Sequence, residues 1–348
     1  MSGSQEATTR ITMKKFVCMS LFVAAIMALY SFAPKDKIDE TIQEEVGLSL
    51  SKISDDKLCK GHVYPLSRPS TWTGCLGGVS AKQKFYWSTF RLLALSPDGN
   101  DLAYISVKDK AGNVMIRRAA GMSTATQRTF RSVMGVTWGC DDKLYFSDIS
   151  SGSYNSKIFA TNARAGSVMQ QMTNSGNDDD PVLSPDGKTL FFSRLEVGGP
   201  SIWSLNLETG ALTSCARGFG ACPIDNERFL CVRNSQTGQS EIWMVDFNKG
   251  QETLVLSDPE RGFTNPSLSP DGQWIVCEGS SKSSISKKFN LDIFAVRIDG
   301  TRFTQLTYHP AMDCCPVFSK DGKNIYFLSN RSQRKSDYCD IWSMKFLL

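Results

Sequence analysis

The sequence predicts an all-β protein, a six-bladed β-propeller of four-stranded antiparallel blades. Three observations lead to this fold: a recurring turn motif, a short apolar run after every copy, and a second marker further downstream. The clearest copies of the turn are Ser96–Gly99, Ser184–Gly187, Ser269–Gly272 and Ser319–Gly322. Three of them read Ser-Pro-Asp-Gly, in which serine suits the first position, proline presets φ at the second and glycine accepts the dihedrals of the fourth. Each copy therefore predicts the tip of a β-hairpin.

Two weaker copies of the turn, Gly139–Asp142 and Pro223–Asn226, bring the number of units to six. The turn aspartates recur every 39 to 50 residues, as Asp98, Asp141, Asp186, Asp225, Asp271 and Asp321. Downstream of the turn, an isoleucine followed by an aromatic residue opens another strand in five units, at Ile158, Ile202, Ile242, Ile293 and Ile341. Units of this length with four short strands are typical of propeller blades, which stack around an axis because one blade cannot bury both of its faces.

Closure of the ring is predicted from the place where the repeats are cut. The chain ends in the third strand of the sixth unit, so the fourth strand of that blade is expected from sequence ahead of Ser96. Residues 62–66 and 84–88 are both candidates for this closing strand. Pairing the two ends of the chain in one blade removes an open sheet edge.

The chain divides into three predicted segments. Residues 1–33 have a basic start at Lys14 and Lys15, a 15-residue apolar run and small residues near Ala33, which predict a signal peptide or an N-terminal membrane anchor. Residues 34–82 are a linker or N-terminal extension that includes a candidate closing strand, and residues 83–348 form the propeller. We therefore expect an exported protein of the periplasm or cell envelope, either soluble or anchored at its N-terminus.

Composition excludes some classes of partner. The net charge is +4, and part of it belongs to the leader, so the body of the protein is close to neutral. A nearly neutral body gives no reason to expect nucleic acid as a partner. Membrane contact is expected only through an uncleaved N-terminal anchor.

The repeat resembles the TolB-type propeller repeat of bacterial envelope proteins. The copies that carry the resemblance are Asp178–Gly187 and Asp313–Gly322, which follow the family pattern Asp-x-x-Pro-x-φ-Ser-Pro-Asp-Gly nearly verbatim. Propellers of this type occur as interaction scaffolds, as envelope-assembly components and as gating domains of oligopeptidases, so the resemblance implies the fold more narrowly than the function. TolB carries a sizeable globular domain ahead of its propeller, and the residues between leader and propeller here are too few for one. The resemblance therefore concerns the repeat and not membership of the Tol-Pal system.

Candidate catalytic chemistry is sparse in the sequence. The chain has two histidines, His62 and His309, which are too few for the multi-histidine site of propeller lyases. A Gly-x-Ser-x-Gly nucleophile elbow is absent. The acidic cluster 177–180 and the turn aspartates Asp98, Asp186, Asp271 and Asp321 are given structural roles in turns and between blades. We predict no catalytic residue, no metal and no cofactor.

The cysteines divide into buried thiols and candidates for disulfides. Cys231 and Cys277 occupy a position that is aromatic in other units, so both are expected to be free and buried. In an exported protein the remaining cysteines suggest disulfides. The candidate pairs are Cys59 with Cys75, Cys215 with Cys222, and Cys339 with Cys314 or Cys315.

Candidate partner-binding residues are those outside the repeat pattern. Trp203, Trp243 and Trp342 recur at one repeat position and are expected to pack between blades. The candidates on blade connections or outside the repeat are Trp72, Trp87, His309, Arg331 and Arg334, with the insertion 280–288 as a further place.

The sequence thus predicts a non-catalytic envelope scaffold that binds a protein or peptide partner at one mouth of the ring. The alternative is a propeller-fold hydrolase or lyase, acting on a glycan or peptide at a site in the central channel.

Overall fold

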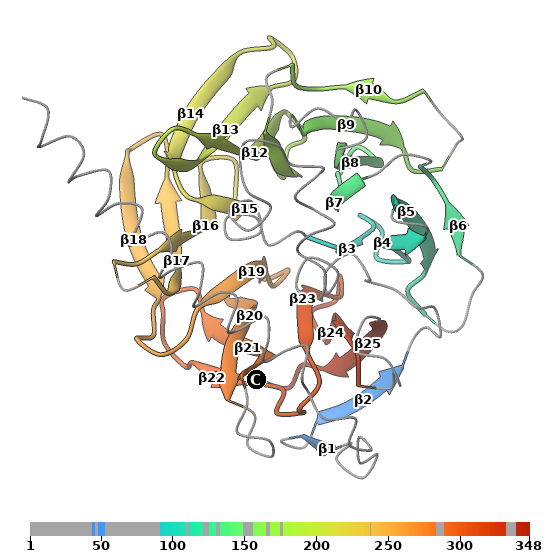
Figure 1. The fold of residues 1–348 in the computed structure, drawn as a ribbon, viewed down its shortest axis with the longest axis vertical. Helices are drawn as coiled ribbons and strands as arrows, with labels where there is room; N and C mark the ends of the chain where they lie inside the picture. The colour runs from blue at the N-terminus through green and yellow to red at the C-terminus, as the bar shows by residue number, and fades with distance from the viewer. Residues whose placement is uncertain are drawn as a thin grey trace, which may run out of the picture.

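Six sheets surround a common axis and follow one another in chain order, from cyan through green and orange to red (Figure 1). This computed structural model describes residues 44–45, 48–52, 91–108, 111–120, 125–129, 133–148, 156–164, 168–174, 177–236, 238–282, 289–331 and 339–348. All elements in these ranges are strands, and every pairing is antiparallel. The predicted six-bladed, all-β architecture is confirmed.

The first three blades each contain four strands in chain order from the axis outward. Blade 1 consists of β3 (Leu93–Leu95), β4 (Asp101–Lys108), β5 (Ala111–Arg118) and β6 (Thr126–Gln127). Blade 2 consists of β7 (Val133–Trp138), β8 (Lys143–Asp148), β9 (Lys157–Asn162) and β10 (Gln170–Gln171). Blade 3 consists of β11 (Asp178–Leu183), β12 (Thr189–Glu196), β13 (Gly199–Asn206) and β14 (Leu212–Arg217).

Blades 4 and 5 repeat this arrangement, whereas the sheet of blade 6 has three strands from the end of the repeat and two short strands from residues 44–52. Blade 4 consists of β15 (Phe219–Pro223), β16 (Arg228–Asn234), β17 (Ser240–Asp246) and β18 (Gln251–Leu256). Blade 5 consists of β19 (Phe263–Leu268), β20 (Trp274–Lys282), β21 (Phe289–Arg297) and β22 (Thr304–Gln305). Blade 6 consists of β23 (Asp313–Phe318), β24 (Asn324–Ser329) and β25 (Asp340–Lys345), with β2 (Leu48–Lys52) and β1 (Glu44–Glu45) beyond β25.

The hydrophobic core lies between the blades. Each apolar cluster joins neighbouring sheets: blade 2 to 3, 3 to 4, 4 to 5 and 5 to 6, while the largest joins blades 6, 1 and 2. Phe191 of blade 3, for example, packs on Phe229 of blade 4 with ring centroids 5.4 Å apart. Because the apolar side chains lie between sheets, each blade is stabilised by both of its neighbours.

The Ser-Pro-Asp-Gly turns share one hydrogen-bond network. In blade 1, the Ser96 hydroxyl donates to the Asp98 carboxylate at 2.6 Å, and the backbone N–H of Asn100 donates to the same carboxylate oxygen at 3.0 Å. The turns at Asp186, Asp271 and Asp321 repeat both bonds. The serine hydroxyl lowers the pKa of Asp98 below its ordinary range. We call the face of the ring that carries these turns the turn face.

Blade 6 packs directly against blade 1. Lys320, in the turn of blade 6, donates from its ammonium group to the carbonyl of Pro97 in the turn of blade 1. Cys314 and Leu328 of blade 6 belong to the same apolar cluster as Leu93 of blade 1. The ring therefore closes through side-chain packing between its first and last blades.

The strand beside β25 in this structure is β2, with Ser51 opposite Ser343. The two segments favoured by the sequence, 62–66 and 84–88, lie outside the described residues, so the identity of the closing strand stays a prediction. The predicted leader, residues 1–33, and most of the segment 34–82 also lie outside them. Within the described part of the chain, no helix is long and apolar enough to cross a membrane.

Cross-linking distinguishes the three candidates for the closing strand. In a Ser51→Cys, Ser343→Cys double variant we expect a disulfide under mild oxidation, because facing residues on paired strands lie within the reach of an S–S bond. Peptide mass spectrometry detects the bond. Tyr64→Cys or Tyr86→Cys combined with Ser343→Cys tests the other two segments, and a bond at either of them instead of Ser51 contradicts the pairing of β2.

Candidate binding site in the central channel

The innermost strands carry a bulge next to the axis. The register of β7, β11, β15, β19 and β23 shifts at one point, and a residue with positive φ lies at each shift. These residues are Gly135, Asp180, Gly220, Asn265 and Cys315, with φ between 50° and 69°. A bulge changes the direction of a side chain relative to its neighbours on the strand. The bulges therefore set which side chains face the axis.

Arg91 links three blades across the centre of the ring. It lies just ahead of β3 in blade 1, and its guanidinium Nη2 donates to the carbonyl of Ala221 in blade 4 at 2.9 Å. Its backbone N–H donates to Asp180 Oδ1 in blade 3 at 3.4 Å. A positive charge is thus held near the axis by strands that are far apart in the sequence.

Asp180 is a buried carboxyl beside this arginine. The residue is 2% exposed, and its Oδ2 has no hydrogen-bond partner among the described residues. Burial raises the pKa of Asp180 to about 7, although the charge of Arg91 acts in the opposite direction. A carboxyl group with this pKa changes its protonation state near neutral pH.

A cavity of about 290 Å³ opens along the axis, and we call it the mouth cavity. Residues of all six innermost strands line it, and Ser96, Pro270 and Lys320 place its rim among the turns of the turn face. Arg91, Asn265 and Cys315 line its deeper part. The remaining lining includes the apolar residues Leu93, Leu95, Trp138, Val182, Pro266, Leu268, Pro316, Val317 and Phe318. A concave, mostly apolar surface with a few polar groups is the usual character of a binding pocket.

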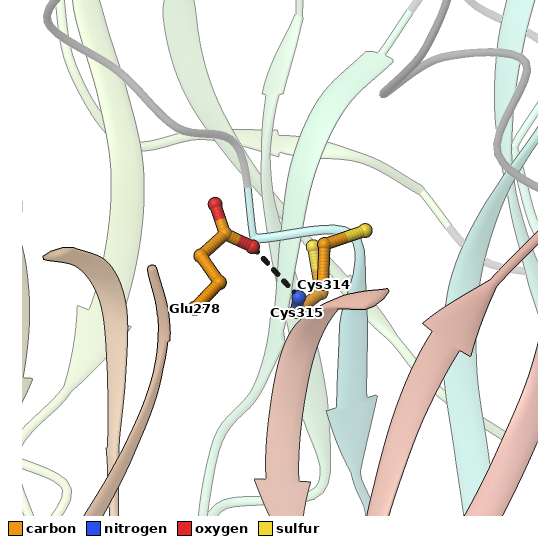
Figure 2. Close-up of side chains that lie close together, drawn as sticks. All are labelled: Glu278, Cys314 and Cys315. Atoms are coloured by element: carbon orange, nitrogen blue, oxygen red, sulfur yellow. Dashed lines mark hydrogen bonds between the residues drawn. The ribbon is translucent and has the colours of Figure 1, made fainter. Parts of the chain in front are cut away.

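Two thiols and a carboxylate meet between blades 5 and 6 (Figure 2). Glu278 lies on β20, and Cys314 and Cys315 are consecutive residues of β23. Their ligating atoms all lie within 4.8 Å of one another, and each residue is at most 2% exposed. Glu278 Oε2 accepts a hydrogen bond from the backbone N–H of Cys315 at 2.8 Å. This is the one group of three candidate metal ligands within the described ranges, and it was not predicted from the sequence.

Blades 3 and 6 each contain a buried ion pair stacked on a tryptophan. In blade 3, Arg194 donates two hydrogen bonds to Asp178, at 2.7 and 3.0 Å, and lies 4.5 Å above the ring of Trp203. In blade 6, Arg331 pairs with Asp313 and lies over Trp342. Each of these two tryptophans therefore contacts the arginine of its own blade and helps to hold it in place, a role that was not expected in addition to packing between blades.

His309 and Arg331, expected on exposed connections, are both interior residues. His309 is 3% exposed and Arg331 is 7% exposed. The ring Nδ1 of His309 accepts a hydrogen bond from the backbone N–H of Ala311, and burial next to Arg331 lowers the pKa of His309 to about 4. The imidazole is therefore neutral at physiological pH, and the two side chains support the fold of blade 6 from within.

No disulfide joins any two of the cysteines that the structure describes. Cys231 and Cys277 are fully buried, which confirms their predicted place in the core. Cys215 lies on β14 and Cys222 on β15, and they belong to different apolar clusters. Cys339 lies within hydrogen-bonding reach of Cys314. The proposed disulfides stay predictions, and Cys59 and Cys75 lie outside the described residues.

Three of the predicted partner-binding residues, Trp72, Trp87 and Arg334, also lie outside the described residues, as does most of the insertion 280–288. The residues that do approach the axis were not singled out for binding. A signal for them exists in the sequence: Gly135, Asp180, Asn265 and Cys315 each lie six residues before the turn aspartate of their blade. One of these four residues is a glycine, the residue that most readily adopts a positive φ. Aligning the repeats on their turn aspartates therefore indicates a positive φ at this position.

Comparisons with known proteins agree on the propeller. A family model described as the TolB beta propeller domain matches residues 93–284, more than half of the chain. The Tol-Pal system protein TolB of Bordetella pertussis is 28% identical over 116 residues, which cover 33% of this chain and 26% of that protein. An uncharacterised protein of Agrobacterium fabrum is 27% identical over 188 residues, covering 52% of this chain and 60% of its own length. The match thus spans about a quarter of the TolB relative.

Solved structures show the same fold at lower identity. A putative TolB from Agrobacterium tumefaciens has a TM-score of 0.56 at 18% identity, covering 76% of this chain and 93% of that one. TolB from Acinetobacter baumannii has a TM-score of 0.55 at 18% identity, covering 71% and 64%. Since the repeat, the family model and these structures agree, the chain belongs to the TolB β-propeller family.

Proposed function

We propose that this protein is an exported, non-catalytic propeller that binds a protein or peptide partner of the cell envelope at the turn-face mouth of its ring. The mouth cavity carries this proposal. It is the place where apolar side chains from all six innermost strands surround an open space that ends in a charged residue, Arg91. Residues at the mouth of a repeat-built ring are a common basis for recognition.

The size and charge of the cavity indicate what part of a partner enters it. A space of about 290 Å³ admits a few side chains of an extended segment or loop, and is too small for a folded domain. The prolines and leucines of the lining favour apolar side chains, and Arg91 at the deeper end favours a carboxylate. An extended, apolar segment with an acidic group fits both features.

The cellular location of the partner is inferred from the leader and from the family. The basic start and apolar run of residues 1–33 support export. The relative from Bordetella pertussis is a Tol-Pal system protein, and this likeness supports a place among envelope proteins. Because the match covers about a quarter of that relative, the proposal names an envelope partner and not a particular one.

Filling the mouth cavity is expected to abolish partner capture. Ser267 on β19 lines the cavity, so Ser267→Trp places a large ring in the space that the partner would occupy. Tagged protein is incubated with envelope extract, and captured proteins are identified by mass spectrometry. We expect one partner with the wild type and at least a ten-fold loss of it with Ser267→Trp.

The matched control is Gln251→Trp, which adds the same ring to the exposed outer strand β18 of blade 4. This variant should capture the partner as the wild type does. Equal capture by all three proteins, or loss with Gln251→Trp alone, contradicts binding at the mouth cavity.

One observation favours the enzymatic alternative. A buried carboxyl with a pKa of about 7 next to an arginine is a type of group that can act as a general acid or base. If Asp180 has this role, turnover of a glycan or peptide library should be detectable and should be lost in Asp180→Asn. We expect no turnover that depends on Asp180, because the hydrogen bond that it accepts from the backbone N–H of Arg91 accounts for its position.

A further inference from the structure

Cys314 and Cys315 are consecutive residues whose thiols nevertheless lie close together. On a regular strand, successive side chains point to opposite faces of the sheet. The φ of Cys315 is 52° and the register of β23 shifts between Cys314 and Val317, so the alternation is broken at this point. The bulge brings both sulfur atoms within 4.8 Å of each other and of the Glu278 carboxylate (Figure 2).

Cysteine is an unusual residue at this position of the repeat. The equivalent residues of the other bulges are Gly135, Asp180, Gly220 and Asn265, which are the residue types that best tolerate a positive φ. A cysteine there carries backbone strain of about 1 kcal/mol or more. Strain that the fold retains often marks a functional residue, and a thiol contributes ligand chemistry that glycine and asparagine lack.

Glu278 is a larger acceptor than the bulge itself requires, and its second oxygen, Oε1, accepts a hydrogen bond from the Thr264 hydroxyl at 2.9 Å. In blade 3, Ser193 accepts a hydrogen bond from the bulge N–H of Gly220 at 3.0 Å, just as Glu278 accepts one from the bulge N–H of Cys315. Ser193 and Glu278 both lie seven residues after the turn aspartate of their blade. A hydroxyl therefore suffices to hold a bulge, and the buried carboxylate of Glu278 adds a negative charge next to two thiols.

We propose that Glu278, Cys314 and Cys315 form a binding site for Zn²⁺. Thiolate and carboxylate together suit zinc, which accepts sulfur and oxygen ligands in tetrahedral sites. Bonds of about 2.3 Å in such a site place two sulfur atoms about 3.8 Å apart, and because the ligand atoms all lie within 4.8 Å of one another, the side chains need to move by no more than about 1 Å. Cys339, whose thiol lies within hydrogen-bonding reach of Cys314, is available as the fourth ligand.

Binding replaces protons by the metal ion. One Zn²⁺ that binds Cys314 and Cys315 forms two zinc–sulfur bonds, and the two thiol protons pass to solvent. A third proton follows if Cys339 binds as well, and affinity therefore falls as the pH is lowered. Cys315 lines the mouth cavity, which gives an entry path from the turn face.

Metal titration tests the site in the full-length protein. The reduced apo-protein is titrated with Zn²⁺ against a chromogenic zinc indicator, and Co²⁺ is used separately to detect the thiolate charge-transfer band. We expect one equivalent of Zn²⁺ in the wild type and at least a 100-fold weaker affinity in Cys314→Ala and Cys315→Ala. Loss of a hydrogen-bond partner of a metal ligand typically lowers metal affinity 10- to 100-fold, and loss of a ligand itself should lower it further.

Cys231→Ala and Cys277→Ala are the matched controls, because each removes a fully buried thiol from the second strand of a blade and neither residue is a ligand of the proposed site. Both should bind Zn²⁺ as the wild type does. Thermal unfolding provides a readout that tolerates weakened folding: Zn²⁺ should raise the Tm of the wild type and of both controls, but not of Cys314→Ala or Cys315→Ala.

Three results would overturn the proposal. The first is no uptake of Zn²⁺ by the reduced wild type, and the second is equal uptake by all variants. The third is a disulfide among Cys314, Cys315 and Cys339 in the protein as isolated, with zinc unable to bind after its reduction. Each is visible by native mass spectrometry of the same samples, and none depends on the partner-binding function.

Discussion

Asp178→Ala is expected to lower the free energy of unfolding by about 3–5 kcal/mol. Asp178 is fully buried and accepts two hydrogen bonds from Arg194, whose side chain is 12% exposed. Removing the carboxylate leaves the guanidinium buried without its partner, and the loss of a buried charge partner is more destabilising than the loss of an exposed one. Urea denaturation followed by tryptophan fluorescence measures the change.

An exposed ion pair of the same blade provides the control. Lys188 and Glu208 lie 3.3 Å apart, and both side chains are more than half exposed. Glu208→Ala should change the stability by less than about 1 kcal/mol, as is usual for surface pairs. An Asp178→Leu, Arg194→Leu double variant should recover much of the stability lost in Asp178→Ala, because both charges are then absent. Equal effects of Asp178→Ala and Glu208→Ala would contradict the assigned role of the buried pair.

Asp180→Asn is expected to stabilise the protein at alkaline pH and to flatten its stability profile between about pH 4 and pH 7. The folded-state pKa of Asp180 is raised from 3.8 to about 7. Below pH 4 the carboxyl is neutral in both states. As the pH rises, the carboxyl ionises first in the unfolded chain. This ionisation lowers the free energy of the unfolded state relative to the folded state, until the pH passes the pKa of the folded state. The wild type therefore loses up to about 4 kcal/mol across this window, at 1.36 kcal/mol for each pKa unit.

The asparagine variant keeps the local structure for two reasons. Asn265 has the same position in blade 5 with a φ of 51°, and an amide oxygen can still accept the hydrogen bond from the backbone of Arg91. Denaturation curves from pH 4 to pH 8 measure the profile. Glu260→Gln removes one exposed negative charge and should leave the profile unchanged. Parallel profiles for wild type and Asp180→Asn would show that Asp180 ionises normally in the folded state.

The blade structure was predictable because its signals are local. Each Ser-Pro-Asp-Gly turn determines its own conformation through the serine and aspartate side chains, and the apolar runs on either side determine the hairpin. The burial of Cys231 and Cys277 was predictable for the same reason, since both occupy a repeat position whose environment other blades reveal.

The site was harder to predict because it depends on contacts between distant blades. Arg91 gains its role only where blade 1 meets blades 3 and 4, and Glu278 meets its two thiols only across the boundary of blades 5 and 6. His309 and Arg331 were expected at the surface because they lie in blade connections. Their burial follows from Asp313 and Trp342, which attract the arginine into the blade. Contacts of this kind join residues that have no fixed spacing in the sequence.

Photo-cross-linking in living cells tests the central claim, that a partner occupies the mouth cavity, most directly. A photo-reactive amino acid replaces Ser267 inside the cavity or Gln251 on the outer strand of blade 4, and adducts are identified after irradiation. We expect a specific adduct with one envelope protein from position 267 and none from position 251. An adduct with the same protein from position 251, with none from position 267, would place the partner on the side of the ring and contradict binding at the mouth.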